Sequence, residues 1–349
     1  MADDGDAPGG DAPPAPRPDS RLGRRLLVAV VLGLVVYAAL ALWADLDGLG
    51  AALAAIPWWA PACACALSLV NYAVRFPRWQ RYLAITGSQV RGRESFRIYL
   101  AGLALTVSPG KVGEALKSWL LRDADGTPLA TSAPIVLAER VTDLLGFLVL
   151  IGLTSQAGEH TWIALATLGL ATAVLLLVAS RRVAHAATAV AGRLPGVGAR
   201  AAKLEEALDS ARRLLAPREL PVATLLAAAG WFCECVGCWI IAQSVLPAVA
   251  PAGAEPSAAL GLAGVTYAFA LSAVAGAVVV IAPGGLGVTE GLLTGLLERG
   301  YRTAAVAAAP ARATALSVTL VTRLCTLWFA MGVGLIALQL QRRARSRAH

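Results

Sequence analysis

Charged residues follow a break in an otherwise apolar segment, residues 106–121. The break is Ser108-Pro109-Gly110, and the charged residues behind it are Lys111, Glu114 and Lys117. Ser108 can cap the helix that restarts here, with Pro109 at its first position. The N-terminus of such a helix has free N–H groups and a partial positive charge, so a phosphate is its natural ligand. The spacing therefore predicts an anion-binding site at this break.

The same pattern returns at residues 281–297. With two extra residues allowed, Pro109, Gly113 and Glu114 align with Pro283, Gly287 and Glu290. The second break is Pro283-Gly284-Gly285, and glycine and leucine stand where the first repeat has Lys111 and Lys117. Two broken helices in matching halves of an apolar chain are typical of transport sites near the middle of a bilayer. We expect the first break to be the more electropositive one.

Further charges interrupt the apolar segments downstream of the two breaks. Glu139 and Asp143 lie one helical turn apart within residues 129–153, with Arg140 beside them, and Arg323 lies in the last apolar segment. Ionisable groups inside a membrane span are costly and usually face a site or a partner. The arginines can give a phosphate bidentate contacts. The carboxylates of both repeats and of this triplet either take up protons or contact an amine, or they pair with the arginines and hold the helices.

The composition indicates an integral membrane protein of the all-α class. Of the 349 residues, 57% are hydrophobic and only 15% are charged, whereas soluble domains average about 45–50% apolar and about 25% charged residues. The net charge of +8 lies in arginine-rich loops and the C-terminal tail, which favours anionic lipid headgroups as partners. No basic module with interleaved aromatics suggests nucleic acid. The six cysteines suggest small buried residues, so we expect no metal and no cofactor.

The apolar pattern predicts a polytopic helical domain made of two halves that resemble inverted repeats. The expected regions are a disordered tail (1–20), a membrane domain (21–340) with halves 21–180 and 221–340 joined by a basic linker with an amphipathic helix (181–220), and a basic tail (341–349). The expected spans are 26–43, 57–74, 129–153, 162–180, 222–246 and 310–340. Each half also contains a broken, re-entrant hairpin, and the two enter from opposite faces. Residues 258–282 are long enough to cross fully, so a topology with more crossings stays open.

A basic stretch follows the second expected span, and we place it in a loop on the cytoplasmic side. It contains Arg75, Arg78 and Arg81, with aromatic residues beside them. Such a loop either anchors the topology or collects lipid headgroups. Basic residues before the first span and after the last one predict that both termini are cytoplasmic, in the plasma membrane.

In five short motifs the chain resembles the membrane region of lysylphosphatidylglycerol synthases, a flippase-like family that includes stand-alone membrane proteins. The matching pieces are residues 75–79, 109–114, 139–143, 283–290 and Arg323. The resemblance implies eight or so membrane helices, including broken ones, and a role in moving or handling lipids. Family members that make the lysyl-lipid have an additional soluble aminoacyl-transfer domain, which we do not expect here. We therefore expect no synthase activity and no enzyme.

The function that these features favour is that of a lipid flippase or transporter. It would move a phosphate-containing lipid, of the phospholipid or polyprenyl-phosphate type, between leaflets. The residues expected to bind the substrate are Lys111, Glu114, Lys117, Glu139, Arg140, Asp143, Glu290 and Arg323. Alternatives are a membrane-embedded transferase that acts on a lipid-phosphate donor and a non-catalytic accessory subunit. The internal symmetry favours transport over both, and the sequence leaves the oligomeric state open.

Overall fold

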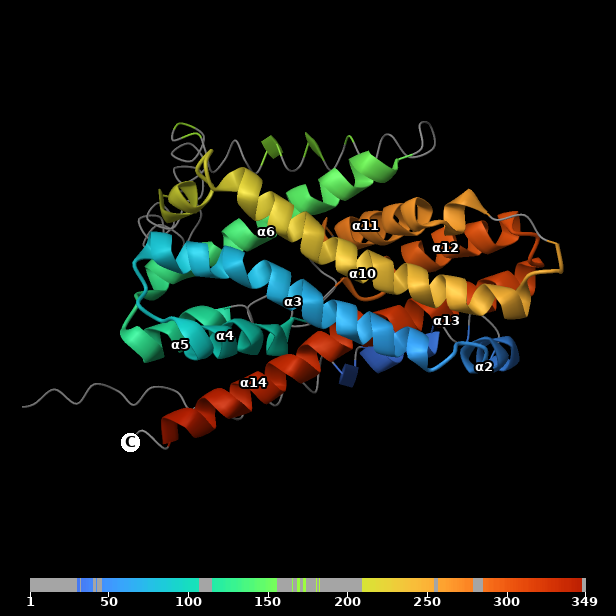
Figure 1. Ribbon diagram of the computed structural model, residues 1–349, viewed down its shortest axis with the longest axis horizontal. Helices are drawn as coiled ribbons and strands as arrows, with labels where there is room; N and C mark the ends of the chain where they lie inside the picture. The colour runs from blue at the N-terminus through green and yellow to red at the C-terminus, as the bar shows by residue number, and fades with distance from the viewer. Residues whose placement is uncertain are drawn as a thin grey trace, which may run out of the picture.

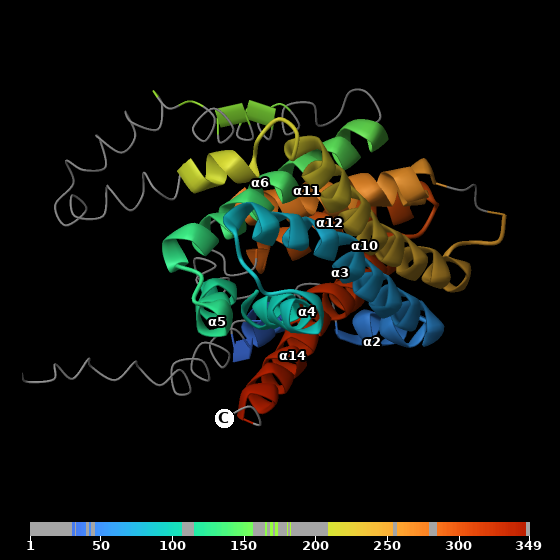
Figure 2. The ribbon, with the colours of Figure 1, turned by 60° about the vertical axis from the view of Figure 1, so that its left-hand side comes forward.

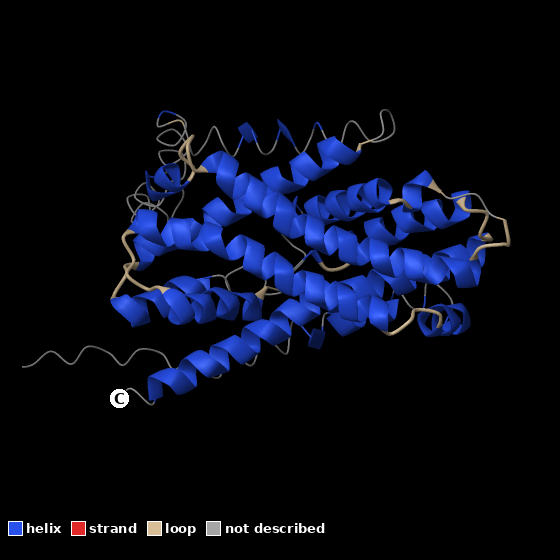
Figure 3. Cartoon of the chain, viewed as in Figure 1, coloured by secondary structure: helices blue, strands red, loops and turns tan. Residues whose placement is uncertain are grey.

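The computed structural model shows an elongated bundle of helices (Figures 1 and 3). It describes residues 30–31, 33–39, 42, 46–106, 115–155, 165, 168–169, 172–173, 180, 182, 209–253, 257–278 and 285–346, and among these no strand occurs. The helices are α2 (Leu46–Ala54), α3 (Trp59–Thr86), α4 (Gly92–Ala101), η1 (Gly102–Leu105), α5 (Ala115–Asp125), α6 (Leu129–Thr154), α10 (Leu220–Val249), η3 (Ala258–Leu260), α11 (Leu262–Val278), α12 (Val288–Thr303), α13 (Ala308–Arg323), the π-helical η5 (Leu324–Trp328) and α14 (Phe329–Ser346). The predicted all-α class is confirmed.

Long apolar helices match several of the predicted spans. Helix α6 coincides with the span predicted at 129–153, and α10 contains the one predicted at 222–246. Helices α13, η5 and α14 form one continuous helix, Ala308–Arg345, and this helix and α10 are long and apolar enough to cross a bilayer. Helices α2 and α3, bent by 73° at a short break, give a third candidate within the described residues. The predicted spans 26–43 and 162–180, the linker up to residue 208, and the break residues Ser108, Pro109, Gly110, Lys111, Gly113, Glu114, Pro283 and Gly284 fall largely or wholly outside those residues.

The loop predicted at Arg75, Arg78 and Arg81 is wrong, because α3 continues through all three arginines to Thr86. The proline inside this segment, Pro77, lies on the exposed side of the helix and does not end it. Arg75 and Arg78 are buried, whereas Arg81 is exposed and pairs with Glu219 at 2.9 Å. The prediction ended the span at residue 74 because three arginines follow. In the structure the buried carboxylate of Asp143 neutralises two of them, so the helix continues.

Two helical hairpins occupy the positions of the broken segments, and hydrogen bonds close each one at its base. In the α4–α5 hairpin, Asp125 Oδ2 accepts from Ser88 Oγ at 2.7 Å and from the Gln89 backbone N at 2.9 Å. Burial raises the pKa of Asp125, but these bonds and those from Thr127 outweigh it and hold the pKa below its ordinary value. In the α11–α12 hairpin, the Ser257 and Thr303 hydroxyls lie 2.6 Å apart. Each hairpin therefore returns to the point where it started.

Helices α3 and α10 are antiparallel, and each hairpin packs on a helix from the other part of the chain. Helices α3 and α10 pack along each other, with Arg81 beside Glu219 at one end and Ala64 beside Gly237 at the other, so they are antiparallel. Helix α4 and η1 pack on α14, as Figure 2 shows, while α11 packs on α6. Each hairpin thus lies against the long helix that follows the other hairpin. The division of the chain into two inverted halves stays a prediction.

The close packing of the first hairpin on α14 depends on Gly334. A Cβ atom at this position would lie 2.6 Å from the Leu103 carbonyl carbon and 2.7 Å from Ala104 Cα, both in the backbone of η1. We expect the Gly334→Ala variant to lose about 1–3 kcal/mol of stability, because backbone cannot move aside for the added methyl group. Thermal unfolding in detergent would measure this loss. Gly332→Ala is the matched control, since its Cβ meets nothing within 4 Å; equal losses in both variants would contradict this reading.

Candidate functional site

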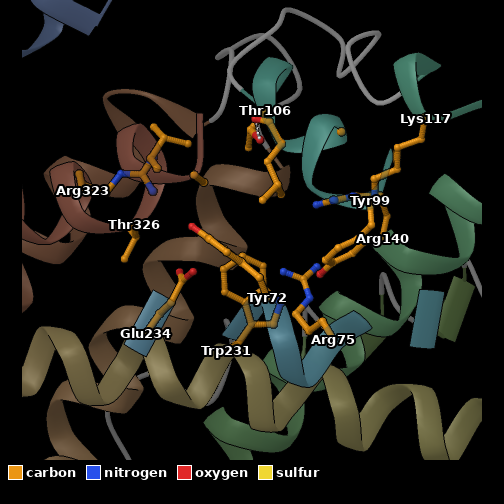
Figure 4. Close-up of a pocket in the computed structure, with 14 residues that line it drawn as sticks. Tyr72, Arg75, Tyr99, Thr106, Lys117, Arg140, Trp231, Glu234, Arg323 and Thr326 are labelled. Carbon is orange, nitrogen blue, oxygen red and sulfur yellow. Dashed lines mark hydrogen bonds between the residues drawn. The ribbon is translucent and has the colours of Figure 1, made fainter. Parts of the chain in front are cut away.

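A polar cavity of about 100 Å³ lies where α3, η1, α5, α6, α10 and the end of α13 meet. Of the described residues that line it, four are cationic: Arg75, Lys117, Arg140 and Arg323. Figure 4 shows Arg323 and Glu234 on one side and Arg75, Arg140 and Lys117 on the other, with Tyr72 and Trp231 between them. A cavity of this size has room for several waters.

Asp143 of α6 holds the arginines of α3 in place. Its carboxylate accepts from Arg75 Nη2 at 2.8 and 3.0 Å and from Arg78 Nη1 at 2.8 Å, and Arg140 Nη1 lies 3.5 Å away. Thr142 Oγ1 also accepts from Arg78 Nη1 at 2.8 Å. Asp143, Arg75 and Arg78 are all buried, so these charges interact strongly in a medium of low dielectric constant. One carboxylate therefore orients three guanidinium groups.

Lys117 enters the cavity from the first hairpin and pairs with Glu139 of α6. Its Nζ atom lies 2.8 Å from Glu139 Oε2, and both side chains are buried. The same ammonium group lies over the rings of Trp79 and Tyr99, 5.0 and 5.1 Å from their centroids. Ring faces attract a cation, and a carboxylate accepts its hydrogen bonds. The charge of Lys117 is thus fixed in position at the cavity wall.

Glu290 performs two tasks at the start of α12. Its Oε1 accepts from Arg323 Nε at 2.6 Å, and its Oε2 accepts from the Gly287 backbone N at 2.7 Å. The second bond caps the helix, and Gly287 has φ of +87°, a conformation that favours glycine. Glu290 is fully buried. It therefore ties the second hairpin to an arginine that lines the cavity.

Glu234 differs from Asp143, Glu139 and Glu290, because its hydrogen bond comes from an amide and not from a cation. Asn71 Nδ2 donates to Glu234 Oε1 at 2.5 Å, and no described residue forms a salt bridge with this carboxyl group. Nearby, the Tyr72 hydroxyl and Trp231 Nε1 are buried and have no hydrogen-bond partner among the described residues. Buried polar atoms normally find a partner. This side of the cavity therefore has donors available for water or a ligand.

The structure brings together part of the predicted site and separates the roles of its members. Lys117, Arg140 and Arg323 line one cavity, while Glu139, Asp143 and Glu290 lie behind them as their partners. Glu290 forms an ion pair with Arg323, the contact that one of the two interpretations of the carboxylates expects. Whether any of these residues binds a substrate stays a prediction.

Several lining residues were not predicted from the sequence, namely Arg75 as a cavity residue, Tyr72, Tyr99 and Trp231. Glu234 was recognisable only as a polar residue in an apolar span. A signal was present in the spacing, because Tyr72 and Arg75 on α3 and Trp231 and Glu234 on α10 each lie three residues apart, on one helix face.

Long apolar helices around buried ion pairs and a polar cavity define an integral membrane protein of the all-α class. The chain belongs to the family described as the lysylphosphatidylglycerol synthase TM region, whose family model matches residues 30–334. The matched region contains both hairpins and every charged residue of the cavity described above. The resemblance inferred from the five motifs is therefore confirmed. None of the curated proteins matches the chain.

Proposed function

We propose that this protein moves a phosphate-containing lipid between the two leaflets of the plasma membrane, by binding its headgroup in the cavity. The observation that carries the proposal is that both hairpins supply a cation or its partner to one buried cavity. Lys117 comes from the first hairpin, and Glu290 of the second hairpin holds Arg323. Inverted repeats that meet at a shared site are the usual architecture of alternating access.

The charges of the cavity suit a phosphate. Arginine forms bidentate bonds with phosphate oxygens, and lysine contributes a point charge. The carboxylates Asp143, Glu139 and Glu290 hold these cations from behind, so little reorganisation is needed when an anion arrives. The phosphate would replace waters in a site of low dielectric constant, where its attraction to the cations is strong.

The hairpins are the parts that would let the headgroup enter and leave. Their bases lie at opposite ends of the bundle, because one follows α3 and the other follows the antiparallel α10. We place the base of the α4–α5 hairpin on the cytoplasmic side, with each hairpin re-entrant in the membrane. In support, basic residues gather there: Arg81, Arg91, Arg93 and the end of α14, where Arg345 lies 3.7 Å from Glu94.

A neutral replacement of one buried pair tests the proposal with little risk to the fold. In the Lys117→Met, Glu139→Gln double variant, both charges of the pair disappear together, so no buried charge is left without its partner. We expect headgroup translocation in reconstituted vesicles to fall about tenfold or more, as for the loss of one charge-assisted hydrogen bond. The measurement is the accessibility of labelled phospholipid headgroups from each side of the vesicle.

The control is the Arg81→Gln, Glu219→Gln double variant, which removes an exposed pair of the same kind from the end of α3. It is expected to translocate lipid as the wild type does. Wild-type rates in both double variants would reject the cavity as the headgroup site, and a wild-type protein that moves no lipid would reject the proposal itself. Lipids that are chemically changed would favour the membrane-embedded transferase instead.

A further inference from the structure

An apolar groove of about 530 Å³ lies on the outside of the bundle, between the first half of α3 and the segment η5–α14. Among the described residues that line it none is charged, and its walls include Pro61, Cys65, Trp328, Phe329 and Ile336. The groove is partly open, and the exposed Ile336 is among the residues that line it. An apolar face of this kind on a membrane protein is expected to border lipid tails.

The groove and the polar cavity share one wall, the π-helical η5. Thr326 and Leu327 line the cavity, whereas Cys325 and Trp328 line the groove. π-Helical turns inside α-helices are rare and frequently mark functional sites. This turn therefore separates a charged cavity from an apolar groove.

Two hydrogen bonds between described residues cross the seam between α3 and η5. Ser68 Oγ donates to the Cys325 backbone O at 3.0 Å, and Cys325 Sγ donates to the Pro61 backbone O at 3.5 Å. Along α3, Cys65 lines the groove, Ser68 lies at the seam, and Tyr72 lines the cavity. A single face of α3 thus leads from the apolar groove to the charged cavity in about two helical turns.

We infer that this groove binds an acyl chain of the lipid whose phosphate enters the cavity, so that the lipid straddles the α3–η5 seam. The inference rests on the proposed function and adds where the acyl chain of the lipid lies. A headgroup and its chains are covalently joined, and the chains cannot follow a phosphate into a cavity lined by four cations. An uncharged groove that shares a wall with that cavity keeps the chain in apolar surroundings while the headgroup is inside.

Filling the groove tests this inference. Gly332 lines the groove, and a Cβ atom built on it meets nothing within 4 Å, so the Gly332→Phe variant can place its ring in the groove. We expect translocation of a diacyl phospholipid to fall about tenfold or more, as for the loss of contact with about two methylene groups. sn-Glycerol 3-phosphate has no acyl chain and tests the cavity alone. It should stabilise the detergent-solubilised Gly332→Phe variant as much as it stabilises the wild type. Gly295→Phe on the exposed face of α12 is the control, because its Cβ is equally unhindered.

Photolabelling shows directly where the acyl chain of the lipid lies. Phosphatidic acid with a diazirine in the middle of one acyl chain should label the peptide that contains Trp328 and Ile336 in wild-type vesicles, and Gly332→Phe should abolish this label. Label elsewhere, together with wild-type translocation by Gly332→Phe, would overturn the groove and leave the proposed function standing. If the wild type were neither stabilised by glycerol phosphate nor able to translocate lipid, the proposed function would be rejected, and labelling would then show only whether an acyl chain occupies the groove.

Two native cysteines allow the seam itself to be locked. The Cys65 and Cys325 side chains contact each other from α3 and η5. Oxidation by copper phenanthroline would join the two thiols, with molecular oxygen as the electron acceptor, and we expect it to stop translocation until dithiothreitol reduces the bond. The Cys65→Ser variant should be insensitive to the oxidant. Undiminished translocation by the cross-linked protein would overturn a lipid that straddles the seam.

Discussion

The Asp143→Asn variant is expected to lose about 3–5 kcal/mol of stability, the usual cost of removing one partner of a buried ion pair. Asparagine has nearly the same shape as aspartate, so the loss would come from charge and not from a cavity. Arg75 and Arg78 are buried and depend on this carboxylate, with bonds of 2.8 Å from each. Lipid translocation should also disappear, because Arg75 and Arg140 line the cavity and would no longer be held in position.

Thermal unfolding in detergent, followed by tryptophan fluorescence, would measure the loss in stability. Glu219→Gln is the matched control, because it makes the same chemical change against another arginine of α3, Arg81. That pair is exposed, and exposed ion pairs contribute little to stability, so the control should unfold as the wild type does. Adding Arg78→Gln to Asp143→Asn should restore part of the stability, since one fewer buried charge then lacks a partner. Similar unfolding of Asp143→Asn and Glu219→Gln would show that the buried cluster does not stabilise the bundle.

The helices of this protein were predictable from the sequence where hydropathy alone determines them. In a membrane the backbone of a span must satisfy its own hydrogen bonds, so a long apolar segment is expected to form an α-helix. Helix α6 matches the prediction within about two residues at each end, within the usual uncertainty of helix boundaries. Helix α3 does not, because the prediction took Arg75 and Arg78 as the end of the apolar run. A single-chain pattern cannot reveal that Asp143, more than sixty residues away, neutralises them.

The candidate site was predictable only for its charged members. Charges inside apolar spans are rare enough to stand out, and this singled out Lys117, Arg140 and Arg323, which the structure places around one cavity. Tyr72 and Trp231 carry no charge and are of a type that is ordinary in membrane helices, so only their spacing from Arg75 and Glu234 could have pointed to them. What brings them together is the antiparallel packing of α3 on α10, and the sequence does not encode that crossing in any local pattern.

The Glu290→Gln variant separates the two tasks of this residue. A glutamine amide oxygen can still accept from the Gly287 backbone N, so the start of α12 should keep its cap. It cannot neutralise Arg323, whose bond to Glu290 measures 2.6 Å. We expect a loss of about 3–5 kcal/mol in stability and a fall of about tenfold or more in translocation, since one misplaced cation weakens phosphate binding. Glu298→Gln on the same helix, whose partner Arg312 is only half-buried and 3.4 Å away, should change both quantities much less.

A second substitution then distinguishes a binding role for Arg323 from a structural one. In the Glu290→Gln, Arg323→Gln double variant both charges of the pair are gone, so stability should recover towards that of the wild type. Translocation should not recover, because the cavity now lacks the only cation that Figure 4 places on the Glu234 side among the labelled residues. Measuring both quantities on the monodisperse fraction of each variant keeps misfolded protein out of the rates. If the double variant moved lipid as the wild type does, Arg323 would be a structural partner of Glu290, and the headgroup would have to bind through the cations of α3, α5 and α6 alone.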